Sequence, residues 1–577
     1  MSARFDERPV LGIRFVWVGA LCCALAATSV RALAAPPGPP SQHALPQLST
    51  AQPSQHALPY LSKAQTSQHA LPYLSTAPPP DEIGGGPVDQ ARHDRIYTRF
   101  FGTHRYARDY SRAAFENTSL LLFELFLYWY EPQSSVVDWQ FPDLQTKVTS
   151  TEAVRFDNNL TRTNFMLHPT AGGMHYLLTR TNGFGVAPSF VAAAGSSAIY
   201  ELLLEWREIV SLNDLIVTPF GGLSSGEFMH QFGNYLNSEP EAVRTSVRGT
   251  LGSTVRDAAR YSGGLPRAVH DALDKPLAPA SAGVDNLGLS RAWFHEFRVR
   301  VGQQSYFDGE GRVGDLFALR SELQLFAMPG FLRPGDFERW YFEGNYGRFH
   351  LRIANGDAGH ATELEFGAHL MGYYAQELRS PTDGYAHEFA LASELVYVDR
   401  KELSGREHYG LVRFPHPAAR FWFGLGDARL ELAVRASADF ASIRSIAFPK
   451  YAARFGETGA KSTLQLHGYA HHFGISAGAS AELIVGDVAF GGSAEHGHYE
   501  SIDVLDREQE TVFRESHESE RMTELEAHFR IEPQGSAVSA QFEAAEVLQD
   551  SYLDSALGNF QGASSVRRLS VELGVVF

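Results

Sequence analysis

The last eleven residues of this 577-residue chain alternate in polarity. The odd-numbered positions from 569 to 577 are all apolar, and the even-numbered positions are polar or glycine except for Val576. Successive side chains of a β-strand point to opposite faces, so the pattern predicts a strand with one apolar wall and one polar wall. Such a strand serves either at the edge of a soluble core or in a membrane barrel.

The same period of two recurs from about residue 292 onward. The segment from Leu430 to Phe440 is the clearest example, because its even-numbered positions are apolar and its odd-numbered positions are polar or charged except for Ala433. We identify roughly a dozen such segments, separated by turns containing Gly, Pro or Asp, and their lengths suit strands tilted across a bilayer. Arg, Glu and His occupy most of the polar walls. This fits a polar barrel interior, but a soluble sandwich would show the same alternation with its polar walls outside.

The N-terminus predicts export. Arg4, Arg8 and Arg14 precede an apolar run over residues 15–30, and the stretch 32–34 (Ala-Leu-Ala) offers a small-residue cleavage site. Residues 1–34 are therefore predicted to be a signal peptide. Cys22 and Cys23 leave with it, so the mature chain has no cysteine, which excludes disulfides, thiol catalysis and Cys-ligated metals.

An apolar strand that ends on a terminal aromatic residue resembles the closing strand of Gram-negative outer-membrane barrels, whose assembly machinery recognises that terminus. With the signal peptide, this predicts a mainly β protein of the cell outer membrane. Its C-terminal antiparallel transmembrane β-barrel, of roughly 12 strands, would span residues 291–577, with Phe577 as the assembly signal. The expected partners are outer-membrane lipid and the barrel-assembly machinery. Nucleic acid is not expected, because the net charge of −17 becomes −19 once the signal, with four basic and two acidic residues, is removed.

Three regions precede the predicted barrel. Residues 35–90 are rich in proline and carry a 13-residue unit three times, beginning at Ser41, Ser54 and Ser67, which predicts a disordered tether. Residues 91–240 predict a small helical domain with helices over 113–130 and 187–209. Residues 241–290 are interpreted as a connector.

The helical region contains an ordered series of polar and glycine motifs that resembles a bacterial envelope family known as domain of unknown function 3943. The resemblance covers about 110 residues and departs from the family pattern at Leu167, where a glycine is expected. It implies an outer-membrane barrel that carries a helical element, and it implies no activity. The matching residues are Asn164, His168, Pro169, Arg180, Asn182, Gly183, Glu201, Asn213, Asp214, Thr218, Pro219, Gly221, Gly222, Gly226 and Glu227.

One hypothesis is that these motif residues form an enzyme active site. His168 has the side chain of a general base, which Asp214 or Glu201 could orient, with Ser197 as nucleophile. This describes a lipid-modifying or hydrolytic envelope enzyme that uses His168 with Asp214 and Glu227. However, Ser197 lacks the surroundings of a nucleophile elbow.

A metal site is a second hypothesis for the same region. Glu227 and His230 are three positions apart, and Glu201 or Glu205 could join them. A di-iron bundle needs two Glu-x-x-His pairs and the region offers one, so we expect no metal and no cofactor.

The favoured hypothesis is structural. Polar groups withdrawn from water must be hydrogen-bonded, so helices packed within or against a polar lumen would need such a network. Asn213 and Asp214 would then cap a helix, Pro169 and Pro219 would set turns, and the glycines would allow close packing. The sequence thus favours a non-enzymatic barrel with a transport, anchoring or structural role, in which the helices form a plug or lining.

Overall fold

The computed structural model describes residues 108–576 with internal gaps, of which the longest are 131–142, 238–293 and 503–515. The predicted signal peptide, tether and connector, and Phe577, lie outside the described residues.

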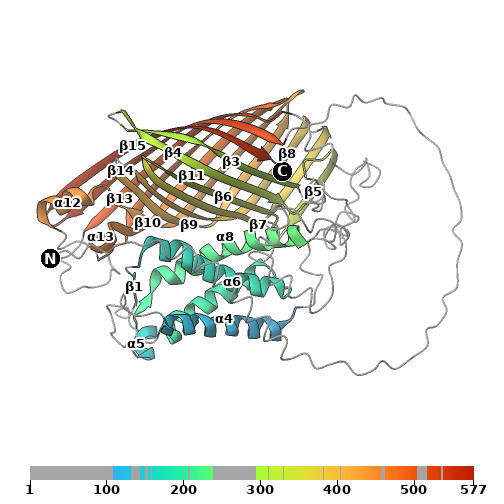
Figure 1. The fold of residues 1–577 in the computed structure, drawn as a ribbon. Coiled ribbons are helices and arrows are strands. Elements are labelled where there is room, and N and C mark those ends of the chain that lie inside the picture. Colours follow the sequence, from blue (N-terminus) through green and yellow to red (C-terminus); the bar gives the residue numbers. More distant parts are fainter. Residues whose placement is uncertain are drawn as a thin grey trace, which may run out of the picture. The chain divides into compact units, whose positions relative to one another are not determined.

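The C-terminal half forms a closed β-barrel of twelve antiparallel strands, as predicted (Figure 1). Each strand pairs with its neighbours in the ring, and β7 pairs with β8 to close it. A thirteenth strand, β5 (Gly335–Tyr341), pairs with the C-terminal part of β7, beyond the start of β6. In order around the barrel the twelve are β7 (Gly359–Ser380), β6 (Tyr346–Gly356), β4 (Gly311–Phe326), β3 (Phe294–Asp308), β15 (Gly558–Val576), β14 (Val538–Ser555), β13 (His517–Ile531), β12 (Val488–Ser501), β11 (Tyr469–Val485), β10 (Ala428–Arg444), β9 (Gly405–Gly424) and β8 (Asp383–Glu402). Two short helices, α12 (Phe448–Phe455) and α13 (Ser462–His467), lie between β10 and β11.

The alternation along the strands separates an apolar outside from a charged inside. Val571 and Leu573 of β15 are 51% and 60% exposed, whereas Glu572 between them is 1% exposed. Glu572 makes an ion pair with Arg300 of β3 at 3.3 Å, and both side chains are buried. A single sheet closed on itself has one enclosed face, so the sandwich alternative does not describe this chain.

The preceding region folds mainly as helices. They are α4 (Tyr110–Tyr130), α5 (Leu144–Thr149), the π-helical turn η3 (Thr163–Leu167), α6 (His168–Thr181), α7 (Val186–Ile199), the π-helical turn η4 (Tyr200–Leu204) and α8 (Leu212–Asn237). Two short strands, β1 (Val154–Arg155) and β2 (Val210–Ser211), pair in parallel. The helices predicted over 113–130 and 187–209 correspond to α4 and to α7 with η4.

Helices α6 and α8 cross closely at their glycines, as predicted. A Cβ atom on Gly172 would lie 1.9 Å from the carbonyl oxygen of Thr218, so only glycine fits there. The predicted turns at the two prolines are wrong. Pro169 lies in the first turn of α6, where its missing N–H costs nothing, and Pro219 lies inside α8. A Cβ on Gly221 would lie 2.8 Å from the ring of Pro169, so this proline packs into the crossing.

Helix α8 packs against the outer wall of the barrel. The Phe228 ring lies 5.6 Å from that of Phe349 on β6 and 5.7 Å from that of Phe366 on β7. Phe349 alternates along β6 with the charged, inward-facing Arg348, so it belongs to the apolar outside. The predicted plug or lining is therefore wrong for the described helices. The physical reason is that α8 presents aromatic side chains, which bury more favourably against the apolar wall than in a charged lumen.

Candidate functional site

The motif residues of the helical layer fall into two polar clusters, and a third lies in the barrel lumen. The first cluster centres on Glu227 of α8, whose carboxylate receives two hydrogen bonds from Arg180 of α6, at 2.9 and 3.0 Å. Tyr176 donates its hydroxyl to the same carboxylate at 2.6 Å, and Gln231 donates its amide at 2.6 Å. Arg180 also donates to the backbone oxygen of Glu343, between β5 and β6, at 2.7 Å. This network joins two helices to the barrel and is saturated, as expected for a structural role.

Burial dominates the electrostatics of this first cluster. Removal from water raises the pKa of Tyr176 well above its ordinary value, and the neighbouring Glu227 carboxylate adds to the rise. Tyr176 is therefore a neutral hydrogen-bond donor. The enzyme hypothesis assigns a role to Glu227. Its carboxylate, however, already accepts hydrogen bonds from Arg180, Tyr176 and Gln231.

The second cluster contains Asp157, His168 and Asp214. The Nε2 atom of His168 lies 3.3 Å from a carboxylate oxygen of Asp214, one of the two acids considered as its orienting partner in the enzyme hypothesis. One potential ligand atom from each of the three lies within 4.8 Å of the others. Burial lowers the pKa of His168, against the opposing effect of Asp157 and Glu124. Burial, followed by the charge of Asp157, raises the pKa of Asp214 well above its ordinary value.

Asn213 connects the carboxylates of the second cluster. Its amide nitrogen donates to Asp157 at 2.8 Å and to Asp214 at 3.0 Å, and its oxygen accepts the backbone N–H of Asp157 at 2.8 Å. The prediction that Asn213 and Asp214 cap a helix is wrong in this respect. The Ser211 hydroxyl accepts the backbone N–H of Asp214 at the start of α8, which leaves the side chain of Asn213 to bridge the two acids.

The remaining motif residues have structural contacts. Glu201 accepts the backbone N–H of Ser211 at 2.8 Å, on the border of the second cluster. Asn182 donates to the backbone oxygen of Leu178 at 2.8 Å near the end of α6, and Gly183 follows with a φ of +84° that favours glycine. A Cβ on Gly226 would lie 2.8 Å from the ring of Tyr176.

The arrangement of Ser197 does not match a hydrolase. Its hydroxyl is buried and donates to the backbone oxygen of Asp214 at 3.2 Å. Within the described part of the chain no hydrogen bond joins Ser197 to His168, so the structure does not assemble the proposed nucleophile and base. Glu227 and His230 share α8, but His230 contacts Asn234 at 3.0 Å, and the described residues place neither Glu201 nor Glu205 in a metal-ligand group with them.

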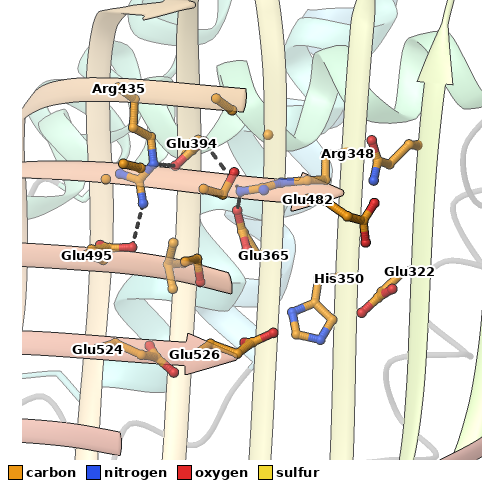
Figure 2. A pocket seen from close by; sticks show the side chains of 18 of the residues that line it. Glu322, Arg348, His350, Glu365, Glu394, Arg435, Glu482, Glu495, Glu524 and Glu526 are labelled. Carbon is orange, nitrogen blue, oxygen red and sulfur yellow. Dashed lines mark hydrogen bonds and ion pairs between the residues drawn. The ribbon is translucent and has the colours of Figure 1, made fainter. Parts of the chain in front are cut away.

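The third cluster lines a cavity of about 480 Å³ in the barrel lumen. Ten arginines and nine glutamates contribute to its wall, so neither sign of charge dominates. Figure 2 shows Arg435 between Glu394 and Glu495, at 3.6 and 2.5 Å. Arg348 makes ion pairs with Glu365 and, at 3.5 Å, with Glu394.

Ion pairs between distant strands cross the lumen at this cavity, and Glu363, Arg400 and Arg568 contribute to its wall. Glu363 of β7 accepts hydrogen bonds from Arg352 and Arg400, both at 2.6 Å, and lies 3.8 Å from Arg568 of β15. Arg400 of β8 also reaches Glu524 of β13 at 3.6 Å, although four strands lie between β8 and β13 in the ring. We call Glu363 and these three arginines the ion-pair constriction. Its side chains are almost entirely buried.

Aromatic side chains form a buried cluster in the lumen, and two of them, Tyr346 and Trp422, also line the cavity. Phe331, which follows β4, stacks on Phe326 with ring centroids 3.7 Å apart and lies 5.3 Å from Trp422. Arg420, on the same face of β9 as Trp422, places its guanidinium 4.8 Å from the centre of the Tyr346 ring. We call Phe326, Phe331, Tyr346 and Trp422 the aromatic cluster. The sequence predicted a polar lumen but showed neither the ion-pair constriction nor the aromatic cluster. Alternation shows which face of a strand a residue occupies, but it does not show which strand lies opposite.

A closed twelve-stranded barrel with an apolar outside and a charged inside is the architecture of outer-membrane β-barrel proteins, and this chain is one of them. Its residues 153–256 match the model of a family described as Domain of unknown function (DUF3943), which confirms the resemblance found in the motifs.

Among solved structures, the chain is similar to an outer membrane channel from Pseudomonas putida F1, at 12% identity, covering 50% of this chain and 95% of that one, with a TM-score of 0.23. It is also similar to the transport unit of the autotransporter AIDA-I from Escherichia coli, at 11% identity, 49% and 90% coverage and a TM-score of 0.20. The translocator domain of the autotransporter NalP from Neisseria meningitidis matches at 10% identity, 56% and 97% coverage and a TM-score of 0.19. No curated protein matches the chain.

Proposed function

We propose that this protein is an outer-membrane channel for small polar or charged solutes. The observation that carries the proposal is the 480 Å³ cavity, enclosed by the barrel and lined by charged side chains of both signs. An apolar solute would displace water from these groups without replacing its hydrogen bonds, which is unfavourable. A solute with its own charges or hydrogen-bonding groups would compensate for that loss.

The size of the cavity limits the solute. Pockets of 300–1,000 Å³ are typical of sites for small molecules, so a folded or extended polypeptide is not the expected cargo. The balance of arginines and glutamates favours solutes that carry both signs of charge, or none, over strongly charged ones. Transport requires Glu363 to separate from the arginines of the ion-pair constriction. The arginines can then pair with other carboxylates, since Arg400, for example, already lies 3.6 Å from Glu524.

Conductance of the full-length protein in planar bilayers tests the proposal. Glu363→Gln removes the central charge of the ion-pair constriction and leaves three arginines mutually repelling, so it should raise the single-channel conductance several-fold. Glu546→Gln is the matched control, because Glu546 pairs with the exposed Arg567 at 2.9 Å, away from the constriction. Membranes that stay electrically silent and impermeable to small polar solutes with both the native and the Glu363→Gln protein would refute a channel.

A further inference from the structure

We propose that Asp157, His168 and Asp214 bind a divalent transition-metal ion, with Zn²⁺ as the representative. The three side chains offer one imidazole nitrogen and two carboxylate oxygens that lie within 4.8 Å of one another. This donor set suits a first-row transition metal, because Ca²⁺ and Mg²⁺ prefer oxygen ligands alone. The inference goes beyond the proposed channel and is independent of it, since these residues lie in the helical layer.

The backbone brings these residues together from three segments of the chain. Asp157 follows β1, and Asp214 is in the first turn of α8, immediately after β2. Because Arg155 is paired with Ser211 in the β1–β2 ladder, the two acids are set side by side. His168 is the first residue of α6. Asn213 then holds both carboxylates through one amide group, so their positions do not depend on a bound ion.

The buried carboxyl groups at this site have no basic side chain paired with them in the described part of the chain. Asp157 and Asp214 are almost completely buried, and so is Glu201 nearby. Among the described residues no lysine or arginine forms an ion pair with either aspartate. The ammonium of the buried Lys147 donates instead to the backbone oxygens of Glu201 and Glu205, at 3.0 and 2.7 Å. Buried carboxylates without a basic partner are costly, and they are stabilised by protons or by a bound cation.

Asn164 provides a second, independent observation. Its side chain is fully buried, and its amide nitrogen donates to Asp157 at 3.2 Å. Its side-chain oxygen has no hydrogen-bond donor in the described part of the chain. Exchanging the two amide atoms would place an oxygen against the carboxylate, so this orientation is the favourable one. The side chain next to the Asp157 carboxylate therefore keeps one buried polar atom unsatisfied among the described residues, as at a ligand site.

Titration of the purified full-length protein with Zn²⁺ tests the site. The protein should carry no histidine tag and should first be stripped with a chelator. Isothermal titration calorimetry is expected to show one saturable site of high affinity. His168→Ala and Asp214→Asn should each weaken Zn²⁺ binding by about tenfold or more, since even residues behind the metal ligands change affinity by 10–100-fold. His230→Gln is the matched control, because it removes a buried helical-layer histidine outside the site and should bind Zn²⁺ like the native protein.

Heat-modifiable gel migration should accompany each titration, so that only folded barrels are compared. Asn164→Asp adds a third carboxylate next to the site and should tighten Zn²⁺ binding, an effect that a purely structural role for Asn164 would not produce. The proposal is overturned if the folded native protein shows no saturable Zn²⁺ site. It is equally overturned if folded His168→Ala and Asp214→Asn proteins bind Zn²⁺ as tightly as the native protein.

Discussion

Arg180 of α6 and Glu227 of α8 are joined by two parallel hydrogen bonds, of 2.9 and 3.0 Å, with both side chains withdrawn from water. This pair fixes the crossing of the two longest motif-bearing helices and, through the backbone of Glu343, attaches them to the barrel. Arg180 and Glu227, two charged residues of the family motif, therefore have a structural role in helix packing.

Loss of the Glu227 charge should destabilise the helical layer strongly. Glu227→Gln leaves the guanidinium of Arg180 buried without its main carboxylate, and breaking a buried pair in this way costs about 3–5 kcal/mol. Glu343→Gln removes a carboxylate that is one-third exposed and lies 3.2 Å from Arg180, so it should cost at most about 1 kcal/mol. Urea unfolding followed by helical circular dichroism measures both. Equal losses from the two substitutions would contradict the role assigned to Glu227.

The glycines at the α6–α8 crossing should not tolerate a methyl group. A Cβ on Gly172 would overlap the backbone oxygen of Thr218, so Gly172→Ala must push the helices apart. We expect a destabilisation of about 1–3 kcal/mol, the range for overpacked sites. Gly195→Ala in α7 is the control, because a Cβ there meets nothing within 4 Å and alanine favours helices by about 1 kcal/mol. Thermal unfolding should therefore move in opposite directions for the two variants, and a neutral Gly172→Ala protein would argue against this crossing.

The aromatic cluster should act as a barrier within the lumen. Phe331→Ala removes the ring stacked on Phe326 and should increase the uptake of small polar solutes into proteoliposomes. Trp340→Ala is the control, because this side chain of β5 is exposed and contacts Tyr373 on the outer wall. Uptake that rises in the Phe331→Ala vesicles and not in the Trp340→Ala vesicles is expected. Unchanged uptake in both would place the barrier elsewhere.

The sequence predicts the barrel well because a period of two is a local property. The alternation within each strand shows which of its faces is apolar and turned to lipid, as the exposed Val571 and the buried Glu572 illustrate. A dozen strands with this alternation predict a closed barrel. The family motif likewise locates the helices and the close approach at Gly222, where a Cβ would lie 2.5 Å from the backbone of Gly172. The sequence also offers Asp214 or Glu201 as the acid that could orient His168, and the structure places Asp214 3.3 Å from it.

The sequence could not show where the helices lie relative to the barrel. Phe220 and Phe228 of α8 would suit any apolar surface, and polar motif residues suit either a lumen or a helical interior. The choice depends on the barrel wall, where Phe349 and Phe414 belong to separate strands that come together only in the folded sheet. The sequence does not show the ion-pair partners of Arg400 either, because Glu363 and Glu524 lie 37 residues before it and 124 residues after it and come close only in the folded barrel.

Cysteine cross-linking between α8 and the barrel tests most directly the claim that the helices cover the outer wall. The predicted mature chain has no native cysteine, so an introduced pair reports one distance only. The pair Phe228→Cys with Gly347→Cys should form a disulfide on mild oxidation, because a Cβ on Gly347, on the same face of β6 as Phe349, would lie 3.6 Å from the Cα of Phe228. The pair Phe228→Cys with Arg348→Cys differs by one position on β6, which points to the lumen, and should not cross-link. Cross-linking of the second pair and not the first would place α8 inside the barrel and contradict this account.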